Sequence, residues 1–166
     1  LARHNEWLRT RLAKENKSDA DNGLTVFLLR ERGLQRGGVE RATRLLEGHG
    51  FCIAEARELD SAEATIAAHA VRGGNWGPGP WPASGGLPAA MIVVYDRDPL
   101  PLNRRQRKKY PFAVNARTFC KDQIRDEFNR GIPDQEHCNV VHSSDNGREA
   151  MEYVRAICGE RADDVL

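Results

Sequence analysis

The pattern of apolar positions indicates strands and helices that alternate along the chain. Leu24 to Arg30 (LTVFLLR) is a continuous apolar run that ends in a charge, which is typical of a strand buried on both faces. Val39 to Gly50 then places apolar side chains on one helical face and closes with glycine, which predicts a helix. The glycine-punctuated residues 31–38 between them are expected to form a turn.

The same pattern continues towards the C-terminus. We expect further strands at 51–60, 89–96 and 137–144, and helices at 61–71 and 146–159. Ser61 is the expected N-cap of the first of these helices. Glycine and proline crowd residues 73–88, which predicts a loop, and a basic connection with one helical turn follows the strand that ends at Asp96.

The predicted order of elements indicates the fold class. A β-α-β-α-β-(basic loop)-β-α order favours an α/β (α+β) ferredoxin-like sandwich, with a mainly antiparallel four-stranded sheet and helices packed on its faces. We divide the chain into an N-terminal helical extension and linker (1–22, with a helix at 5–17), one domain (23–160) and a C-terminal tail (161–166).

Composition excludes little, but it limits the classes of function. The 166 residues suit one domain, and 25 Lys and Arg against 24 Asp and Glu give no global argument for a polyanion or membrane partner. No apolar run is long enough to span a membrane. Four widely spaced cysteines without a CxxC pair favour a reducing, cytoplasmic setting. Because the chain begins with Leu1, we expect a covalently linked neighbouring domain in a longer protein.

The segment NVVHSSD places His142 between the last predicted strand and the last predicted helix. Side chains at the ends of strands project into clefts, and an imidazole with a pKa near neutrality can act as a nucleophile or as an acid and base. The alternative reading is a surface histidine in a turn. The residues alone leave both readings open.

A resemblance to a known family favours the reactive reading. NVVHSSD resembles the active-site segment N-[IV]-[IV]-H-G-S-D of nucleoside diphosphate kinases. Upstream, VFLLRERGLQRGGVERATRLLEGHGF resembles the first strand and helix of that family, and QIRDEF resembles its T-I-R-G-D-F. The likeness extends colinearly from Leu24 to Ile157, most of the chain.

The resemblance implies a phosphotransferase. The enzymes of that family move a γ-phosphate from a nucleoside triphosphate to a nucleoside diphosphate through a phosphohistidine, with magnesium on the phosphates. It implies that His142 is the nucleophile and that Ser144 orients the ring. Arg125 and Asn139 would contact phosphate and sugar, and Arg30 stands where the family has a lysine.

The nucleotide clamp departs from the family pattern. Lys108 aligns with a phosphate-binding arginine, and Val114 replaces a phosphate-binding threonine although valine donates no hydrogen bond. The family's tyrosine, carboxylate and phenylalanine segment, expected after His69, is absent. Trp76 or Trp81 could stack on a base in place of that tyrosine.

Two further functions therefore stay open beside phosphoryl transfer. The domain could be a catalytically degenerate nucleotide-binding or scaffold domain, or the basic run Asn103 to Tyr110, with five Lys and Arg, could bind nucleic acid. The resemblance also implies a homodimer formed through Glu55 to Ala70. The expected cofactor is magnesium carried by the nucleotide, and no set of protein ligands for a metal is predicted.

Overall fold

The computed structural model describes residues 23–71 and 76–166, so the helix expected at 5–17 lies outside the described residues. The strands are β1 (Leu24–Arg30), β2 (Cys52–Glu58), β3 (Pro88–Tyr95) and β4 (Val141–Ser143). The helices are α2 (Glu31–Gly48), α3 (Ser61–Ala70), α4 (Arg104–Lys109), α5 (Lys121–Asn129), α6 (Gly147–Cys158) and α7 (Ala162–Val165), with short 3-10 turns at Ala116–Cys120, Asp134–Glu136 and Gly159–Arg161.

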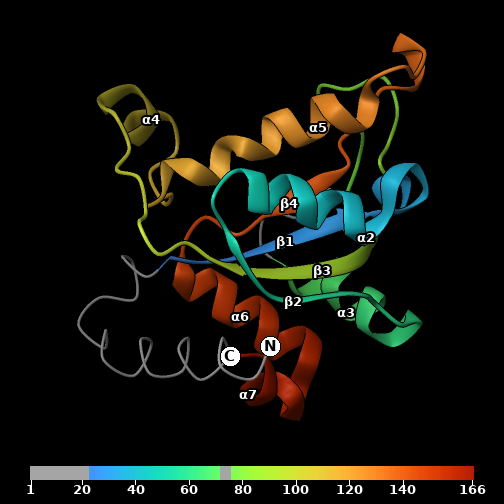
Figure 1. Cartoon of the computed structure of the whole chain (residues 1–166). Helices are drawn as coiled ribbons and strands as arrows, with labels where there is room; N and C mark the ends of the chain where they lie inside the picture. The colour runs from blue at the N-terminus through green and yellow to red at the C-terminus, as the bar shows by residue number, and fades with distance from the viewer. Residues whose placement is uncertain (1–22, 72–75) are drawn as a thin grey trace.

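The strands form one antiparallel sheet in the order β2-β3-β1-β4. Two β-α-β units, β1-α2-β2 and β3-α5-β4, are therefore interleaved, which is the ferredoxin-like topology (Figure 1). The predicted fold class is confirmed. Strands β2 and β4 lie at the two edges of the sheet.

Helices cover both faces of the sheet (Figure 1). Phe27 and Leu29 of β1 pack in the core cluster beneath α2 and α5, whereas Val26 and Leu28 pack in the cluster beneath α3, α6 and α7. Because successive side chains of a strand point to opposite faces, a strand covered on both sides reads as an unbroken apolar run. This burial explains why the periodicity of β1 shows no polar alternation.

Two local predictions are corrected by the structure. Residues 31–37 are helical and belong to α2, and the break comes at Gly38, whose φ of 68° interrupts the helix. The N-cap of α3 is Asp60 and not Ser61, because the Asp60 carboxylate accepts a hydrogen bond from Glu63 N (2.8 Å) and the Glu63 carboxylate accepts one from Asp60 N (3.1 Å). That reciprocal pair is a capping box.

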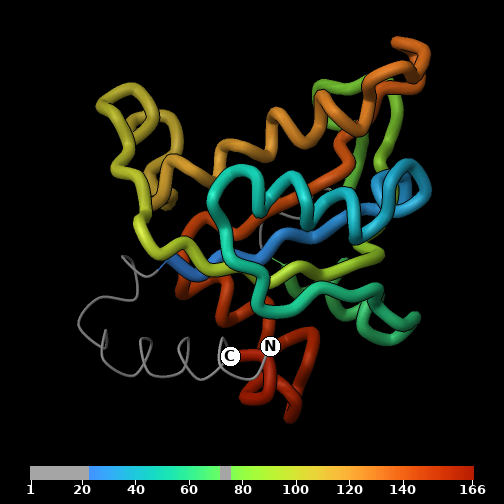
Figure 2. The backbone as a smooth tube through the Cα atoms, in the orientation of Figure 1, coloured from blue at the N-terminus to red at the C-terminus, as the bar shows by residue number. Residues whose placement is uncertain are grey.

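The residues expected as a C-terminal tail are part of the fold. They include α7, whose Ala162 and Val165 are buried in the cluster beneath α6. The tube in Figure 2 shows this end of the chain running below the sheet and the connection that carries α4 standing away from it. Within the described residues, no helix has both the length and the apolarity needed to cross a membrane.

The kink in α2 generates a stability prediction. Gly38→Ala should lower the free energy of unfolding by about 1–2 kcal/mol, because an L side chain is strained at positive φ even where space is open around it. Gly48→Ala is the matched control, since Gly48 is helical and equally uncrowded and should gain up to about 1 kcal/mol. Urea unfolding measures the change in the free energy of unfolding for both variants. Equal changes for the two substitutions would contradict the positive φ at Gly38.

Candidate functional site

His142 lies at the centre of the short edge strand β4, opposite Leu28 of β1. Cross-strand partners share a face, so the half-buried imidazole points to the α6 side of the sheet. Its Nε2 lies 3.2 Å from the Tyr153 hydroxyl of α6. The Trp76 ring meets the imidazole edge to face at a centroid distance of 5.6 Å. The imidazole is thus positioned by the hydroxyl of Tyr153 and by the ring of Trp76.

The surroundings of His142 keep the imidazole neutral. Burial, together with the nearby positive charges of Lys121, Arg125 and Arg30, lowers its pKa to about 4, although the carboxylate of Glu149 opposes the shift. A neutral imidazole carries a lone pair on one ring nitrogen. At neutral pH the ring is therefore in the protonation state that a nucleophile requires.

Lys121, at the start of α5, is a site residue that the sequence analysis missed. Its ammonium donates to Ser143 Oγ at 3.1 Å, and burial, followed by the charge of Arg125, lowers its pKa. Lys121 precedes Arg125 by four residues, so the two lie on one face of the helix. The sequence held a signal for Lys121, because it lies one helical turn before Arg125, a predicted phosphate ligand.

Arg125 and Asn139, which the resemblance assigns to phosphate and sugar contacts, bond each other in the structure. Arg125 donates from Nε to Asn139 Oδ1 (2.9 Å) and from Nη2 to the Val141 carbonyl (3.0 Å). A third donor bonds Asp122 (2.7 Å), and the guanidinium carbon lies 5.2 Å from the centre of the Trp81 ring. Burial lowers the pKa of Arg125, and Asp122 offsets part of that effect. Arg125 therefore binds the segment that leads into β4, directly before His142.

Arg30 is held by the loop that follows α3. Its side chain is 1% exposed and donates to the carbonyls of Gly86 (2.7 Å), Gly77 (3.2 Å) and Trp76, and to Ser84 Oγ (3.3 Å). Burial lowers its pKa. These contacts fix the loop beside His142, and a phosphate could reach Arg30 only by displacing loop carbonyls.

The backbone of this loop lies tightly against the strand that carries His142. A Cβ built on Gly85 would come within 1.7 Å of the Asn139 carbonyl oxygen. Only glycine permits that approach. The loop also takes Trp76 to His142, with the indole nitrogen of Trp76 donating to the Ala68 carbonyl at 2.9 Å.

The other two predicted site residues have different surroundings. Ser144 is buried, and its hydroxyl accepts from Val26 N at 3.0 Å while its own N–H donates to the Val26 carbonyl at 2.9 Å. These two bonds extend the β1–β4 pairing by one residue, while Nε2 of His142 contacts the Tyr153 hydroxyl. Lys108 is exposed on α4 and is not among the charges that shift the pKa of His142.

Tyr153 was missed as the partner of His142, although a signal was present. Ala150, Val154 and Ile157 lie on the buried face of α6, and Tyr153 shares that face at helical spacing. Such a spacing indicates packing, and it does not by itself show that the hydroxyl of Tyr153 meets a histidine. Asn146 caps this helix through Glu149 N (2.9 Å), and Glu149 in turn accepts from Asp145 N (2.6 Å).

The described residues offer no second centre of comparable chemistry. Among them, no group of three or more His, Cys, Asp or Glu side chains could hold a metal ion. A surface cavity of about 280 Å³ is lined by residues of α2 and α5, on the sheet face opposite to the His142 ring. The four cysteines are free thiols.

Comparison with known proteins adds no assignment. No protein-family model matches the sequence, and no curated protein matches it.

The low pKa of His142 predicts a pH dependence of stability. Because the folded-state pKa lies below the unfolded value near 6.5, the unfolded chain binds more protons between pH 6.5 and 4. The contribution of neutral His142 to the free energy of unfolding is therefore complete above about pH 6.5. It falls as the pH falls, and the total loss from this group is at most about 3 kcal/mol.

His142→Gln should flatten that part of the profile. Urea unfolding of both proteins at pH values from 8 down to about 4 measures the difference, and the pH range above 7 serves as an internal control in which the difference should stay constant. Parallel profiles across the acid range would contradict a depressed pKa for His142.

Proposed function

We propose that this domain transfers a phosphoryl group from a nucleoside triphosphate to a nucleoside diphosphate through a phosphohistidine at His142. The observation that carries the proposal is the neutral imidazole of His142 at the sheet edge, within the electrostatic reach of Lys121, Arg125 and Arg30. The resemblance of NVVHSSD to the active-site segment of nucleoside diphosphate kinases also supports it.

The chemistry follows from these groups. The unprotonated ring nitrogen attacks the γ-phosphorus in line, an N–P bond forms, and the bond from phosphorus to the bridging oxygen breaks, so that the nucleoside diphosphate leaves. The reverse step on a second diphosphate restores the free imidazole. Cations that are already desolvated stabilise the charge on the equatorial oxygens more strongly than cations in water.

Two side chains are the best candidates for that stabilisation. Lys121 and Arg125 are half-buried, and both have pKa values lowered mainly by burial, so an anion placed beside them would regain part of their lost solvation. Magnesium would arrive on the phosphates and neutralise part of their charge. Trp81, stacked near Arg125, is the aromatic surface nearest to these cations for a nucleotide base.

The second candidate function is nucleotide binding without turnover. The arrangement of Arg30 favours it, because the guanidinium is buried and its Nε and Nη2 donate to loop carbonyls and not to an open site. Trp76 also covers one side of the imidazole. In this version the domain serves as a nucleotide-binding or scaffold element.

Labelling with γ-³²P-ATP and magnesium tests the proposal. The wild-type protein should acquire acid-labile, base-stable label, which is the signature of a phosphohistidine, and His142→Ala should acquire none. His49→Ala is the matched control, because it removes another half-buried histidine at the end of α2 and should keep the label. Addition of unlabelled diphosphate should discharge the label as labelled triphosphate.

Calorimetric titration with ATP and magnesium separates the candidate functions. Binding without label would overturn phosphoryl transfer and support the nucleotide-binding alternative. Absence of both binding and label would sink both functions.

We also propose a homodimer formed along β2 and α3, as the resemblance implies. Strand β2 is an edge strand that pairs only with β3 in the described chain, so its outer side can accept a second copy. Ile66 of α3, the helix that follows β2 in the chain, is 42% exposed. Light scattering should give the mass of two chains, and Ile66→Asp should shift it towards one; a monomeric wild type would contradict this assembly.

A further inference from the structure

Helix α4 carries a concentrated positive surface, which we call the α4 basic surface and define as Arg104, Arg105, Arg107, Lys108 and Lys109. All five side chains are exposed. Residues 99–121 contain no Asp or Glu, and within the described part of the chain none of the five forms an ion pair. The surface therefore has no internal neutralisation, although the chain as a whole has a formal charge of only +1.

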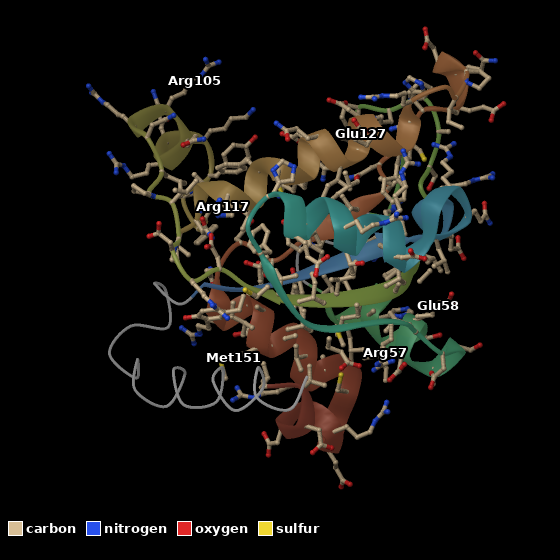
Figure 3. All side chains as sticks on the ribbon, in the orientation of Figure 1. Arg57, Glu58, Arg105, Arg117, Glu127 and Met151 are labelled. Carbon is tan, nitrogen blue, oxygen red and sulfur yellow. The ribbon has the colours of Figure 1, made fainter. Side chains whose placement is uncertain are left out.

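The five cations lie on the solvent-exposed part of the circumference of α4. At about 100° per residue, the five positions occupy an arc of about 200° around α4. The rest of the circumference belongs to Asn103 and Gln106, which bond each other reciprocally in a capping box (both 2.9 Å). Figure 3 shows Arg105 on the outer side of α4, directed away from the sheet.

The segment that carries α4 is anchored at its base. Asp96 is 1% exposed, and its carboxylate accepts from Asn115 Nδ2 (2.8 Å) and Arg117 Nε (2.7 Å). Asn115 Oδ1 in turn accepts from Leu100 N at 2.9 Å. These bonds join the two ends of the segment, so the basic helix is presented in a fixed position and loses little entropy on binding.

Aromatic side chains adjoin the charge. Tyr110 follows directly after α4 and is 37% exposed, and Phe112 is 57% exposed. The Tyr110 ring packs against Phe119, with 4.8 Å between the ring centroids, and its centroid lies 5.1 Å from Nζ of Lys109. Exposed aromatic faces beside a positive surface are the combination with which proteins bind single-stranded nucleic acids, through stacked bases and contacted phosphates.

We propose that the α4 basic surface binds single-stranded nucleic acid, with Lys and Arg on the phosphates and Tyr110 stacked on a base. A helix of six residues is about 9 Å long, which suits a few nucleotides. Bases must be unstacked from a duplex to reach Tyr110, which favours a single strand. An anionic membrane fits less well, because α4 has no apolar face that could lie in a bilayer interface.

This binding is independent of the proposed phosphoryl transfer. Lys108 is not among the charges that act on His142, and the residues that anchor the segment are not shared with the His142 site. We therefore assign Lys108 to the α4 basic surface.

Fluorescence anisotropy with labelled oligothymidine tests the proposal. The logarithm of affinity should fall linearly with the logarithm of salt concentration, with a slope of about 0.7 per phosphate contact and therefore at most about 3.5. The triple variant Arg105→Gln, Lys108→Gln, Lys109→Gln should reduce the slope by about 2 and weaken binding at least about tenfold.

The matched control removes equal charge elsewhere. The triple variant Arg44→Gln, Arg130→Gln, Arg155→Gln changes three exposed cations of α2, α6 and the end of α5 and should leave the slope unchanged. Tyr110→Leu should weaken binding to the single strand about fivefold or more without changing the slope, and should not affect binding to a duplex.

Competition experiments distinguish nucleic acid from mononucleotides and from anionic membranes as the ligand of the α4 basic surface. ATP with magnesium should not displace the oligonucleotide, and His142→Ala should bind it normally, so failure of phosphoryl transfer leaves this result readable. The proposal is overturned by any of four results: no binding at low salt, equal losses in the two triple variants, full displacement by ATP, or tighter binding to anionic vesicles than to the oligonucleotide.

Discussion

The burial of both faces of one four-stranded sheet is the constraint on which the other features depend. Because α2 and α5 cover one face and α3, α6 and α7 the other, the central strands have no polar side open to water. A side chain with chemistry to perform can reach solvent only at an edge or an end of the sheet. His142 occupies such a position, on a strand of three residues at the edge.

The same burial accounts for the loop beside the site. Arg30 ends a fully buried strand, and a guanidinium removed from water must find hydrogen-bond acceptors. The loop after α3 supplies carbonyls from Trp76, Gly77 and Gly86. Satisfying this one cation fixes the path of the loop and puts Trp76 against the imidazole. The cations around His142 then have two effects: they help to keep the ring neutral, and they form a positive field in which an anion would be stabilised.

Much of the fold was predictable because its signals are local. The apolar runs of β1 and β3 and the glycine-closed helix α6 each specify their own conformation. The resemblance implies that Arg125 and Asn139 contact phosphate and sugar, and their hydrogen bond to each other was not predicted from the sequence. The role of Arg30 depends on how a glycine- and proline-rich loop returns to the sheet, which no periodicity encodes. The bond between the Ser144 hydroxyl and Val26 N joins two neighbouring strands, and the sequence around His142 does not reveal it.

The most direct test of this account is the protonation state of His142 in the intact protein. Heteronuclear NMR of the imidazole ring, followed from pH 8 down to pH 4 and assigned by the loss of its signals in His142→Gln, measures the apparent pKa. The account predicts a neutral ring throughout the physiological range and a midpoint near the acid end, at about 4. A midpoint at the ordinary histidine value near 6.5 would contradict it, since the imidazole would then be neither buried among cations nor held neutral by them.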